Sequence, residues 1–289
     1  MDSIHVAAPA KINLGLSILG TRPDGYHDIE TLFQKISLYD EITIRRTGRN
    51  GEISLTCDDP TVPTDTSNLA ARAATLLMQD CGVATGLAIA LKKRIPAGAG
   101  LGGGSSNAAA TLHAVNRLLD LHLSDADLMR YGRQLGADVP FFVISAPAAY
   151  AQGIGDLLTP VCMRTAFWVL IVFPRITIST AWAYTTFSRF NSLTKLSKHS
   201  IHLNSFNTLE DICANLQNDF ERVVFPAHPR IQVLRDRLLR TGARAAALSG
   251  SGSSVFGLFG TAEACARAHE ALAAEPDVTL FIAQALQDP

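Results

Sequence analysis

The first 60 residues alternate short apolar runs with turn-forming residues. The apolar runs fall at 5–8, 12–19, 31–38 and 41–45, and the sequence Arg22-Pro-Asp-Gly between two of them is typical of a tight turn. The pattern predicts four strands and a β-rich beginning to the chain.

Helical spacing begins after residue 64. Leu69, Ala73 and Leu77 recur on one face of a predicted helix over 69–79, and Ser67 is a plausible cap for its first turn. Residues 86–92 are a strand candidate, and a glycine-rich segment then leads into a predicted helix of about four turns marked by Ala108 and Leu112. The glycine segment is thus expected to join a strand to a helix.

A third helix is predicted over 125–135, with a start that resembles a capping box at Ser124 and an end at Gly136. The apolar run after it, over 137–143, is predicted as a strand. Asp138 is therefore expected at the boundary of an element.

The second half of the chain shows the same mixture of helix and strand. Strands are expected over 167–173, 245–248, 254–259 and 279–282, and helices over 262–274 and around Ile231, Leu234 and Leu238. Because the pattern loosens before the strand at 167, we expect two domains, 1–160 and 161–289. The polar stretch 188–208 is predicted to be a long loop.

The composition of the chain indicates which classes of binding partner are expected. Hydrophobic residues make up 47% of the 289 positions and charged residues 18%, with a net charge of -1, so no basic footprint for nucleic acid or an anionic membrane is expected. No apolar stretch approaches the ~18 residues of a membrane span, and no signal peptide is recognisable, which favours the cytoplasm. The five cysteines are far apart and are expected to be buried free thiols.

The segment from Ile95 to Asn107 contains five glycines within seven positions. Glycine allows tight turns and close approach of a ligand, and the N–H groups of a following helix attract anions, so we expect a phosphate site. The letters fit the dinucleotide pattern G-x-G-x-x-G. However, Asp120 ends the following helix instead of the next strand, and no Gly-Lys-Ser/Thr closes a P-loop.

Two further segments have chemistry of their own. In Pro9-Ala-Lys-Ile-Asn, Lys11 and Asn13 are two apart on a predicted strand and hence on one face, where they could meet an anionic or hydroxylated ligand. Ser249-Gly-Ser-Gly-Ser-Ser lies between two predicted strands and by itself is most simply a hairpin turn.

Taken in order, these three segments resemble the motifs of the GHMP small-molecule kinases: an N-terminal Pro-x-Lys-x-Asn strand, a central Pro-x-Gly-x-Gly-Leu-Gly loop and a C-terminal glycine-rich turn. The resemblance implies an α+β, two-domain GHMP kinase fold, with an N-terminal β-rich α/β domain that has the glycine-rich loop before a helix. The C-terminal domain would be a ferredoxin-like α/β domain. Gly104 departs from the pattern, because many GHMP kinases have serine there.

The resemblance also implies transfer of the ATP γ-phosphoryl group to a hydroxyl of a small molecule. Asp138 would be the general base, and Lys11 would orient the hydroxyl and offset charge near it. Asn68 aligns with an adenosine-side position. The ATP phosphates would be bound by Pro96, Ala97, Gly98, Ala99, Gly100, Leu101, Gly102, Gly103, Gly104, Ser105 and Ser106. Mg²⁺ is expected with ATP, but its ligands are not assigned, and it could rest mainly on phosphates and water.

Arg22-Pro-Asp-Gly-Tyr-His-Asp-Ile-Glu-Thr, Gly136-Ala-Asp-Val-Pro-Phe-Phe and Asn218-Asp-Phe-Glu resemble a branch of this family whose acceptor is a cytidine-bearing methylerythritol of non-mevalonate isoprenoid synthesis. That resemblance implies stacking and edge contacts with a cytosine. The substrate-side positions would be Asn13, Tyr26, His27, Thr180 and Tyr184, with Trp182 as an alternative to Tyr184.

Alternatives remain open. A mevalonate, homoserine or sugar acceptor would keep the fold, and a non-catalytic binding protein could use the same scaffold. The expected partner is a small-molecule substrate, with no nucleic acid or membrane, and the protein is expected to be a monomer or homodimer.

Overall fold

The computed structural model describes residues 2–48, 51–194, 201, 206 and 208–288. Its contacts divide the chain into two compact units, each assembled from separate stretches of sequence. Unit 1 comprises Met1–Ala10, Tyr39–Ala97 and Gly102–Ser145. Unit 2 comprises Lys11–Leu38, Gly98–Leu101 and Ala146–Pro289.

Two long strands, β1 (Ser3–Thr21) and β2 (His27–Thr47), contribute to both units. The other elements of unit 1 are β3 (Ile53–Cys57), α1 (Leu69–Asp80), β4 (Gly86–Lys92), α2 (Gly103–Leu118), α3 (Asp125–Leu135) and α4 (Val139–Val143). The remaining elements of unit 2 are β5 (Ala148–Gln152), β6 (Leu157–Val161), β7 (Trp168–Phe173), α5 (Thr180–Thr194), α6 (Leu209–Asn215), α7 (Glu221–Ala227), α8 (Pro229–Arg240), β8 (Ala245–Leu248), β9 (Val255–Phe259), α9 (Ala262–Leu272) and β10 (Thr279–Gln284).

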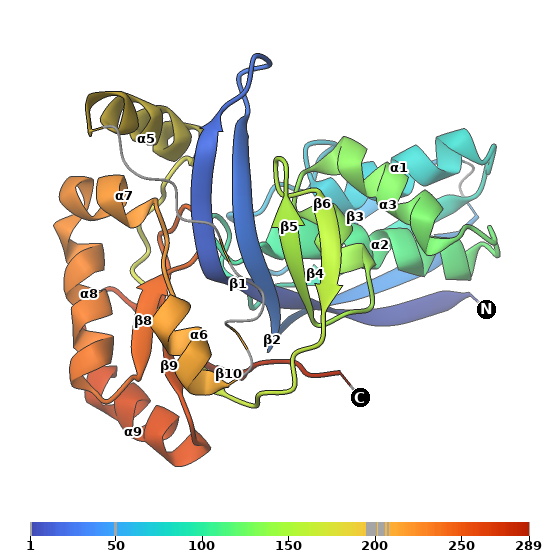
Figure 1. Cartoon of the computed structure of the whole chain (residues 1–289). Coiled ribbons are helices and arrows are strands. Elements are labelled where there is room, and N and C mark those ends of the chain that lie inside the picture. The colour runs from blue at the N-terminus through green and yellow to red at the C-terminus, as the bar shows by residue number, and fades with distance from the viewer. Residues whose placement is uncertain (1, 49–50, 195–200, 202–205, 207, 289) are drawn as a thin grey trace. The chain divides into compact units, whose positions relative to one another are not determined.

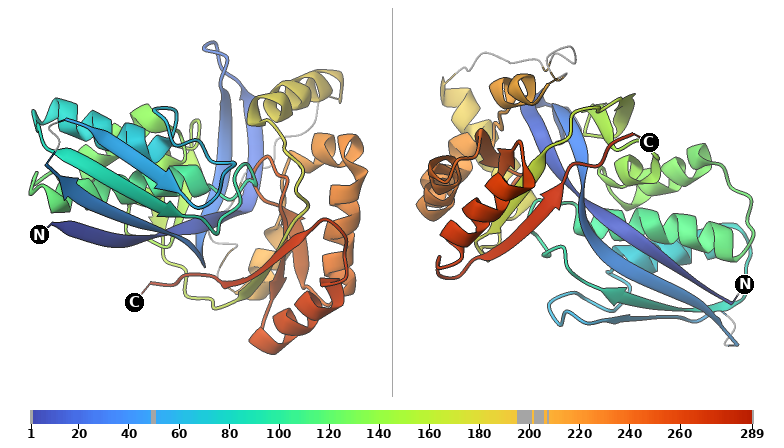
Figure 2. Two further views of the ribbon diagram at one scale, coloured as in Figure 1. Left: turned by 180° about the vertical axis from the view of Figure 1, so that it is seen from behind. Right: turned by 90° about the horizontal axis from the view of Figure 1, so that it is seen from below.

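Unit 1 packs helices on a sheet. β4 lies between β3, to which it is parallel, and the C-terminal part of β2, to which it is antiparallel. Figures 1 and 2 show α1, α2 and α3 together on one face of these strands. Both α1 and α2 are rich in buried alanine, including Ala70, Ala74, Ala108 and Ala109, and such small side chains favour close packing of helices.

Unit 2 contains an antiparallel sheet in the order β10-β7-β9-β8. The helices α8 and α9 cover one face of it (Figure 1), where Leu234 and Leu238 of α8 meet Leu170 and Val172 of β7 in one apolar cluster. A separate hairpin, β5 and β6, pairs with the N-terminal part of β2 through β5.

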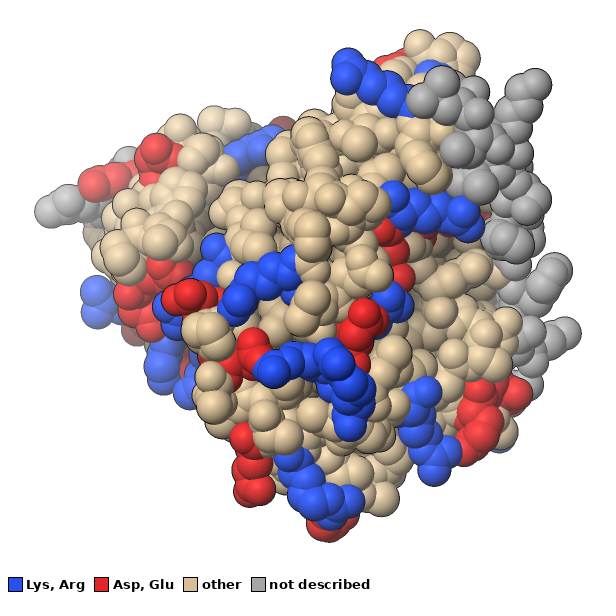
Figure 3. All heavy atoms as spheres, turned by 90° about the vertical axis from the view of Figure 1, so that its left-hand side faces the viewer, with Lys and Arg blue, Asp and Glu red and all other residues tan. Residues whose placement is uncertain are grey.

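Charged side chains of both signs are interspersed on the face that carries α8, as Figure 3 shows. Several of them form ion pairs, such as Arg235 with Glu221 at 3.7 Å and Arg237 with Glu275. On the described part of this face, the charges therefore form no extended patch of a single sign. Among the helices of the described residues, none combines the length and the apolar character needed to cross a bilayer.

Most predicted elements are confirmed, several with the same bounds: 86–92 is β4, 125–135 is α3 and 245–248 is β8. The turn at Arg22 is confirmed by a hydrogen bond from the Gly25 N–H to the Arg22 carbonyl. The capping box at Ser124 is also present. However, the four predicted N-terminal strands are only two, β1 and β2, because the chain continues in extended conformation through the polar positions between the apolar runs.

The prediction of a strand over 137–143 was wrong, because Val139–Val143 form helix α4. A five-residue apolar run is compatible with either element when it is buried on all sides, as this one is. Pro140 at the second helical position favours the helix, since proline fits the first turn without losing a hydrogen bond. Asp138 does lie at an element boundary, directly before α4.

Other predictions need correction. Asn68, not Ser67, caps α1, since the Ser67 hydroxyl instead donates to Asp65. Residues 188–194 belong to α5 and not to a loop, while most of 195–207 lies outside the described residues. The five cysteines are free as expected, but only Cys265 is buried. The elements β3, β5, β6, α5, α6 and α7 were not predicted.

Candidate active site

Lys11 lies in a hydrogen-bonded chain on β1 of unit 2. Its side chain is buried, and Nζ donates to Asn13 Oδ1 at 2.7 Å. Asn13 Nδ2 in turn donates to Thr31 Oγ1 at 2.8 Å, and the Thr31 hydroxyl donates to the Gly15 carbonyl at 2.6 Å. The predicted placement of Lys11 and Asn13 on one face of a strand is therefore confirmed, and the Asn13 amide is fixed with its oxygen toward the ammonium group.

An aromatic ring further defines the position of the lysine. Lys11 Nζ lies 5.2 Å from the ring centroid of Phe33, within the range of a cation–π interaction. Such an interaction compensates part of the cost of burying an ammonium group. The result is a buried cation held in a defined direction, which is the property needed to stabilise negative charge on a bound ligand.

The turn over 249–254, between β8 and β9, lies next to this lysine. A Cβ added to Gly250 would be 3.3 Å from Lys11 Nζ and 3.6 Å from Asn13 Oδ1, so the backbone approaches both groups closely. Asn218 holds the turn, because its Nδ2 donates to the carbonyls of Leu248 and Gly250, each at 2.8 Å. The segment predicted as a simple hairpin turn is thus fixed beside Lys11.

Glu221 holds the end of β8 that leads into this turn. Its carboxylate accepts a hydrogen bond from the Leu248 N–H at 2.8 Å. Burial raises the pKa of Glu221, while the Leu248 N–H and the Arg235 guanidinium act in the opposite direction.

The part of the glycine segment that belongs to unit 2, Gly98–Leu101, packs against this turn. Gly100 adopts φ +77°, and the Ser249 hydroxyl donates to its carbonyl at 2.9 Å. The Ser254 N–H donates to the Ala99 carbonyl at 3.1 Å, and the Lys11 N–H donates to the Leu101 carbonyl at 3.0 Å. The glycine segment, through Gly98–Leu101, and the turn over 249–254 therefore both lie beside the strand that carries Lys11, so all three sequence motifs meet there.

The rest of the glycine segment belongs to unit 1 and starts α2. Gly102, with φ +70°, is the N-cap, and no side chain caps the helix. The first-turn N–H groups are therefore available to an anion, with the positive end of the helix dipole behind them. Ser106 is buried, and its Oγ finds no hydrogen-bond partner among the described residues. These features fit a nucleotide phosphate.

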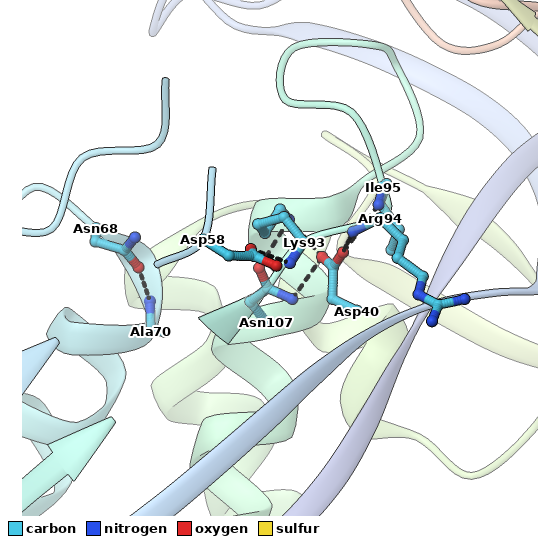
Figure 4. A network of polar contacts seen from close by, with 8 residues as sticks. All are labelled: Asp40, Asp58, Asn68, Ala70, Lys93, Arg94, Ile95 and Asn107. Atoms are coloured by element: carbon cyan, nitrogen blue, oxygen red, sulfur yellow. Dashed lines mark hydrogen bonds and ion pairs between the residues drawn. The ribbon is translucent and has the colours of Figure 1, made fainter. Parts of the chain in front are cut away.

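A buried polar network in unit 1, shown in Figure 4, borders this segment and was not predicted. Asp40, on β2, is completely buried and forms an ion pair with Lys93, which precedes the segment. Asn107, in α2, joins them: its Nδ2 donates to Asp40 Oδ2 at 2.9 Å, and its Oδ1 accepts from Lys93 Nζ at 3.0 Å. The sequence signal for this network was a single aspartate at the end of an otherwise apolar run.

Asn68 serves as the N-cap of α1. Its Oδ1 accepts a hydrogen bond from the Ala70 N–H at 2.9 Å, and its Nδ2 donates to the Pro63 carbonyl at 2.7 Å (Figure 4). The side-chain amide is therefore oriented by the protein on both sides, and a nucleotide contact by Asn68 stays a prediction.

Asp138 is half-buried in unit 1 and directly precedes α4. Its backbone is already helical, with φ -80° and ψ -15°, and its side chain does not cap the helix. The buried residues Val139–Val143 anchor it on its C-terminal side, so the carboxylate is attached to a rigid element, as a general base requires. Its catalytic role stays a prediction.

The aromatic residues predicted to bind a base lie in unit 2. The rings of His27 and Tyr184 stack, with centroids 4.7 Å apart and an interplanar angle of 23°. Tyr184 also meets Phe220 edge-on at 4.8 Å, which fixes its orientation. Tyr26 is 61% exposed and follows the turn at Arg22.

Trp182 is placed differently from Tyr184. Its ring meets His228 edge-on at 5.6 Å, so it is not stacked on His27. Of the two aromatic candidates in α5, the geometry therefore associates Tyr184 with the predicted base-binding segment.

Two hydroxyl groups contact His27. Its Nε2 lies 2.5 Å from Ser188 Oγ and 3.2 Å from Thr21 Oγ1. Burial lowers the pKa of His27, so the neutral imidazole is favoured near pH 7. A neutral imidazole offers one donor and one acceptor, which suits the edge of a nucleobase.

Thr180, at the start of α5, is hydrogen-bonded to the turn over 249–254. Its Oγ1 lies 3.0 Å from Ser251 Oγ. Among the described residues there is no group of three or more His, Cys, Asp or Glu side chains placed to hold a metal ion.

Comparison with known proteins agrees with these features. The family model described as the GHMP kinases N terminal domain matches residues 68–146, and the model described as GHMP kinases C terminal matches residues 197–276. A 4-diphosphocytidyl-2-C-methyl-D-erythritol kinase of Geobacter sp. (strain M21) is 45% identical over 90% of each chain. One of Geobacter metallireducens is 43% identical over 99% of this chain and 100% of its own.

Solved structures lead to the same family. The crystal structure of a 4-(cytidine 5'-diphospho)-2C-methyl-D-erythritol kinase matches with a TM-score of 0.84 and 33% identity, covering 99% of this chain and 100% of that one. A homoserine kinase from Cytophaga hutchinsonii, with a TM-score of 0.74 and 19% identity over 99% of this chain and 95% of its own, shares the fold. The predicted two-domain GHMP kinase fold is confirmed, and this chain belongs to the GHMP kinase family and, within it, to the 4-diphosphocytidyl-2-C-methyl-D-erythritol kinases.

Proposed function

We propose that this protein is an ATP-dependent kinase that phosphorylates the 2-position hydroxyl of 4-diphosphocytidyl-2-C-methyl-D-erythritol in non-mevalonate isoprenoid precursor synthesis. The observation that carries the choice of acceptor is the stacked pair of His27 and Tyr184. Mevalonate, homoserine and sugars have no base to stack, whereas a cytidine does. The relatives described above bear the name of this kinase.

In the proposed reaction the acceptor oxygen forms a bond to the γ-phosphorus of ATP, and the bond from that phosphorus to the β,γ-bridging oxygen breaks, releasing ADP. Asp138 accepts the proton of the acceptor hydroxyl. Lys11, held by Asn13, orients the hydroxyl and offsets negative charge near it.

The glycine segment binds the phosphates through backbone N–H groups. Gly98–Leu101 is fixed by the turn over 249–254, and Gly102–Ser106 contributes the uncapped start of α2. Mg²⁺, when bound with ATP, would neutralise phosphate charge. We assign it no protein carboxylate, and Ser105 or Ser106 is the nearest candidate in the segment.

On the acceptor side, the segment that contains Tyr26 and His27 and the ring of Tyr184 are proposed to bind the cytosine through stacking and edge contacts. Asn13 and Thr180 would contact polar groups of the substrate. We further propose that the protein works in the cytoplasm, as a monomer or homodimer, on a small-molecule substrate.

The experiment is to mix the purified protein with Mg-ATP and each of four acceptors: 4-diphosphocytidyl-2-C-methyl-D-erythritol, mevalonate, homoserine and galactose. ADP release that depends on the cytidine-bearing acceptor supports the proposal. Release with another acceptor would keep the kinase chemistry and overturn the substrate. ATP binding without ADP release in any mixture would favour a non-catalytic binding protein.

A further inference from the structure

Asp40 is the most completely engaged carboxylate at the border of the glycine segment. It is completely buried, and both of its oxygens accept hydrogen bonds. Oδ1 accepts from the Arg94 N–H at 2.7 Å and from the Ile95 N–H at 2.9 Å. Oδ2 accepts from Asn107 Nδ2 at 2.9 Å and from Lys93 Nζ.

These donors come from both ends of the glycine segment, as Figure 4 shows. Arg94 and Ile95 directly precede Pro96, and Asn107 directly follows Ser106. One carboxylate on β2 therefore fixes the backbone before the segment and the helix after it. Fixing both ends of a glycine-rich segment removes much of the conformational freedom that its glycines would otherwise have.

Lys93 makes the arrangement charge-balanced. Its side chain is 5% exposed, its Nζ donates to Asp40 and to Asn107 Oδ1, and its backbone N–H donates to Asp58 at 2.7 Å. Burying an ammonium group costs free energy that an ion pair offsets, so loss of the Asp40 charge would leave Lys93 with an uncompensated charge. Both members of the ion pair are thus constrained to their present positions.

We propose that Asp40 is a positioning residue for nucleotide binding. By holding both ends of the glycine segment, it sets the direction of the N–H groups at the start of α2, and it thereby raises the affinity for the donor nucleotide without contacting it. The inference rests on the proposed function, in which ATP is the phosphoryl donor.

The decisive variant is Asp40→Asn, which has nearly the same shape. Its side chain keeps one acceptor oxygen but presents an NH₂ group either to the Arg94 and Ile95 N–H groups or to Lys93 and Asn107, so one end of the segment is released. We expect the Kd for ADP, measured by calorimetry, and the KM for ATP to rise at least about tenfold, as the loss of hydrogen bonds to a charged group predicts. The KM for the acceptor should stay within about threefold.

Asn116→Ala is the matched control on the same helix. Asn116 bonds both the N–H and the C=O of Leu123, so its loss should lower the thermal midpoint while leaving ADP affinity unchanged. If the role of Asp40 were purely structural, Asp40→Asn would likewise lower the thermal midpoint and leave ADP affinity unchanged. ADP affinity within about twofold of the starting protein in folded Asp40→Asn would therefore overturn the proposal.

Asn107→Ala provides a second variant should Asp40→Asn not fold. It removes the bond from α2 to Asp40 and the bond that Asn107 accepts from Lys93, while Asp40 keeps the Arg94 and Ile95 N–H groups. ADP affinity should fall about threefold to tenfold; no fall would overturn the proposal. In the double variant the two losses should not add, because both act through one carboxylate, and additive losses would contradict this mechanism. Since ADP binding is read without any acceptor, failure of the starting protein to bind ADP would count against the proposed function and not against Asp40.

Discussion

Gly100 and Ser249 lie so close that no side chain fits between them. A Cβ added to Gly100 would be 2.0 Å from the Ser249 carbonyl oxygen and 2.9 Å from the Gly252 carbonyl oxygen. Both obstacles are backbone atoms, which cannot rotate away. Two glycine-rich segments that are distant in the sequence thus fix one another, and Gly100 is required both by its φ of +77° and by this contact.

We expect Gly100→Ala to lower kcat/KM for ATP by about two orders of magnitude or more, because the added methyl group forces Gly98–Leu101 away from the turn over 249–254. Steady-state kinetics with ATP as the varied substrate would measure the loss. A variant with kcat/KM within about threefold of the starting protein would show that the contact is dispensable.

Gly98→Ala and Gly104→Ala are controls for this prediction. Gly98 also has a positive φ, but a Cβ there would meet no other described residue within 4 Å, so the cost is limited to backbone strain of about 1–2 kcal/mol. Gly104 is helical, and outside its own helix a Cβ there would meet, among the described residues, only Leu69, at 3.6 Å, so alanine should stabilise α2 by about 0.5–1 kcal/mol. In urea unfolding, the free energy of unfolding should be highest for Gly104→Ala, lower for Gly98→Ala and lowest for Gly100→Ala.

We expect Asp138→Asn to reduce kcat by about two to four orders of magnitude, the usual contribution of a general base. Asn keeps the size of the side chain at the start of α4, so ADP affinity should be retained. Asp127→Asn, which alters an exposed capping-box carboxylate on α3, is the control and should keep full turnover. A kcat for Asp138→Asn within about tenfold of the starting protein would remove Asp138 from the role of base.

The sequence predicted which residues form the site better than it predicted which distant segments contact each other there. Lys11 and Asn13 could be placed on one strand face because the period of a strand is fixed, and the start of α2 could be placed because the glycine run ends in a helical pattern. By contrast, nothing in the turn over 249–254 specifies that it meets Gly100, because that contact depends on the packing of β1 and β8 in three dimensions.

Asp40 and the segment over 139–143, which was predicted as a strand and forms α4, illustrate two other limits of prediction from the sequence. A single aspartate in an apolar run does not reveal its partners, and Lys93 and Asn107 become its partners only when β2, β4 and α2 pack together. The run after Asp138 is too short and too uniformly apolar for its period to separate helix from strand.

Tyr184→Ala should raise the KM for the cytidine-bearing acceptor about fivefold to a hundredfold, since stacking of a base on an aromatic ring contributes about 1–3 kcal/mol. Tyr184→Phe should keep a KM close to that of the starting protein because the ring remains. Trp182→Ala is the matched control on the same helix, since Trp182 meets His228 instead of His27. If Trp182→Ala raised the KM and Tyr184→Ala did not, Trp182 would be the stacking residue.

Because of Lys35, on β2 of unit 2, the free energy of unfolding of the protein should increase measurably as the pH rises above 8. Its side chain is 6% exposed, and burial lowers its pKa from the ordinary 10.5 to about 8. Below pH 8 the lysine is protonated in the folded and unfolded chains alike. Between pH 8 and 10.5 the unfolded chain still holds a proton that the folded chain has released, so stability rises with pH by up to about 1.4 kcal/mol per pH unit.

Urea unfolding of the starting protein and of Lys35→Met at pH 7, 8, 9 and 9.5 would measure this rise. The stability of the starting protein relative to Lys35→Met should rise by less than about 0.5 kcal/mol between pH 7 and 8 and should then increase by about 1–2 kcal/mol by pH 9.5. Lys92→Met, which alters a lysine that is 56% exposed on β4, should show no such change. Parallel stability curves for the starting protein and Lys35→Met would mean that the folded chain holds the proton of Lys35 as strongly as the unfolded chain does.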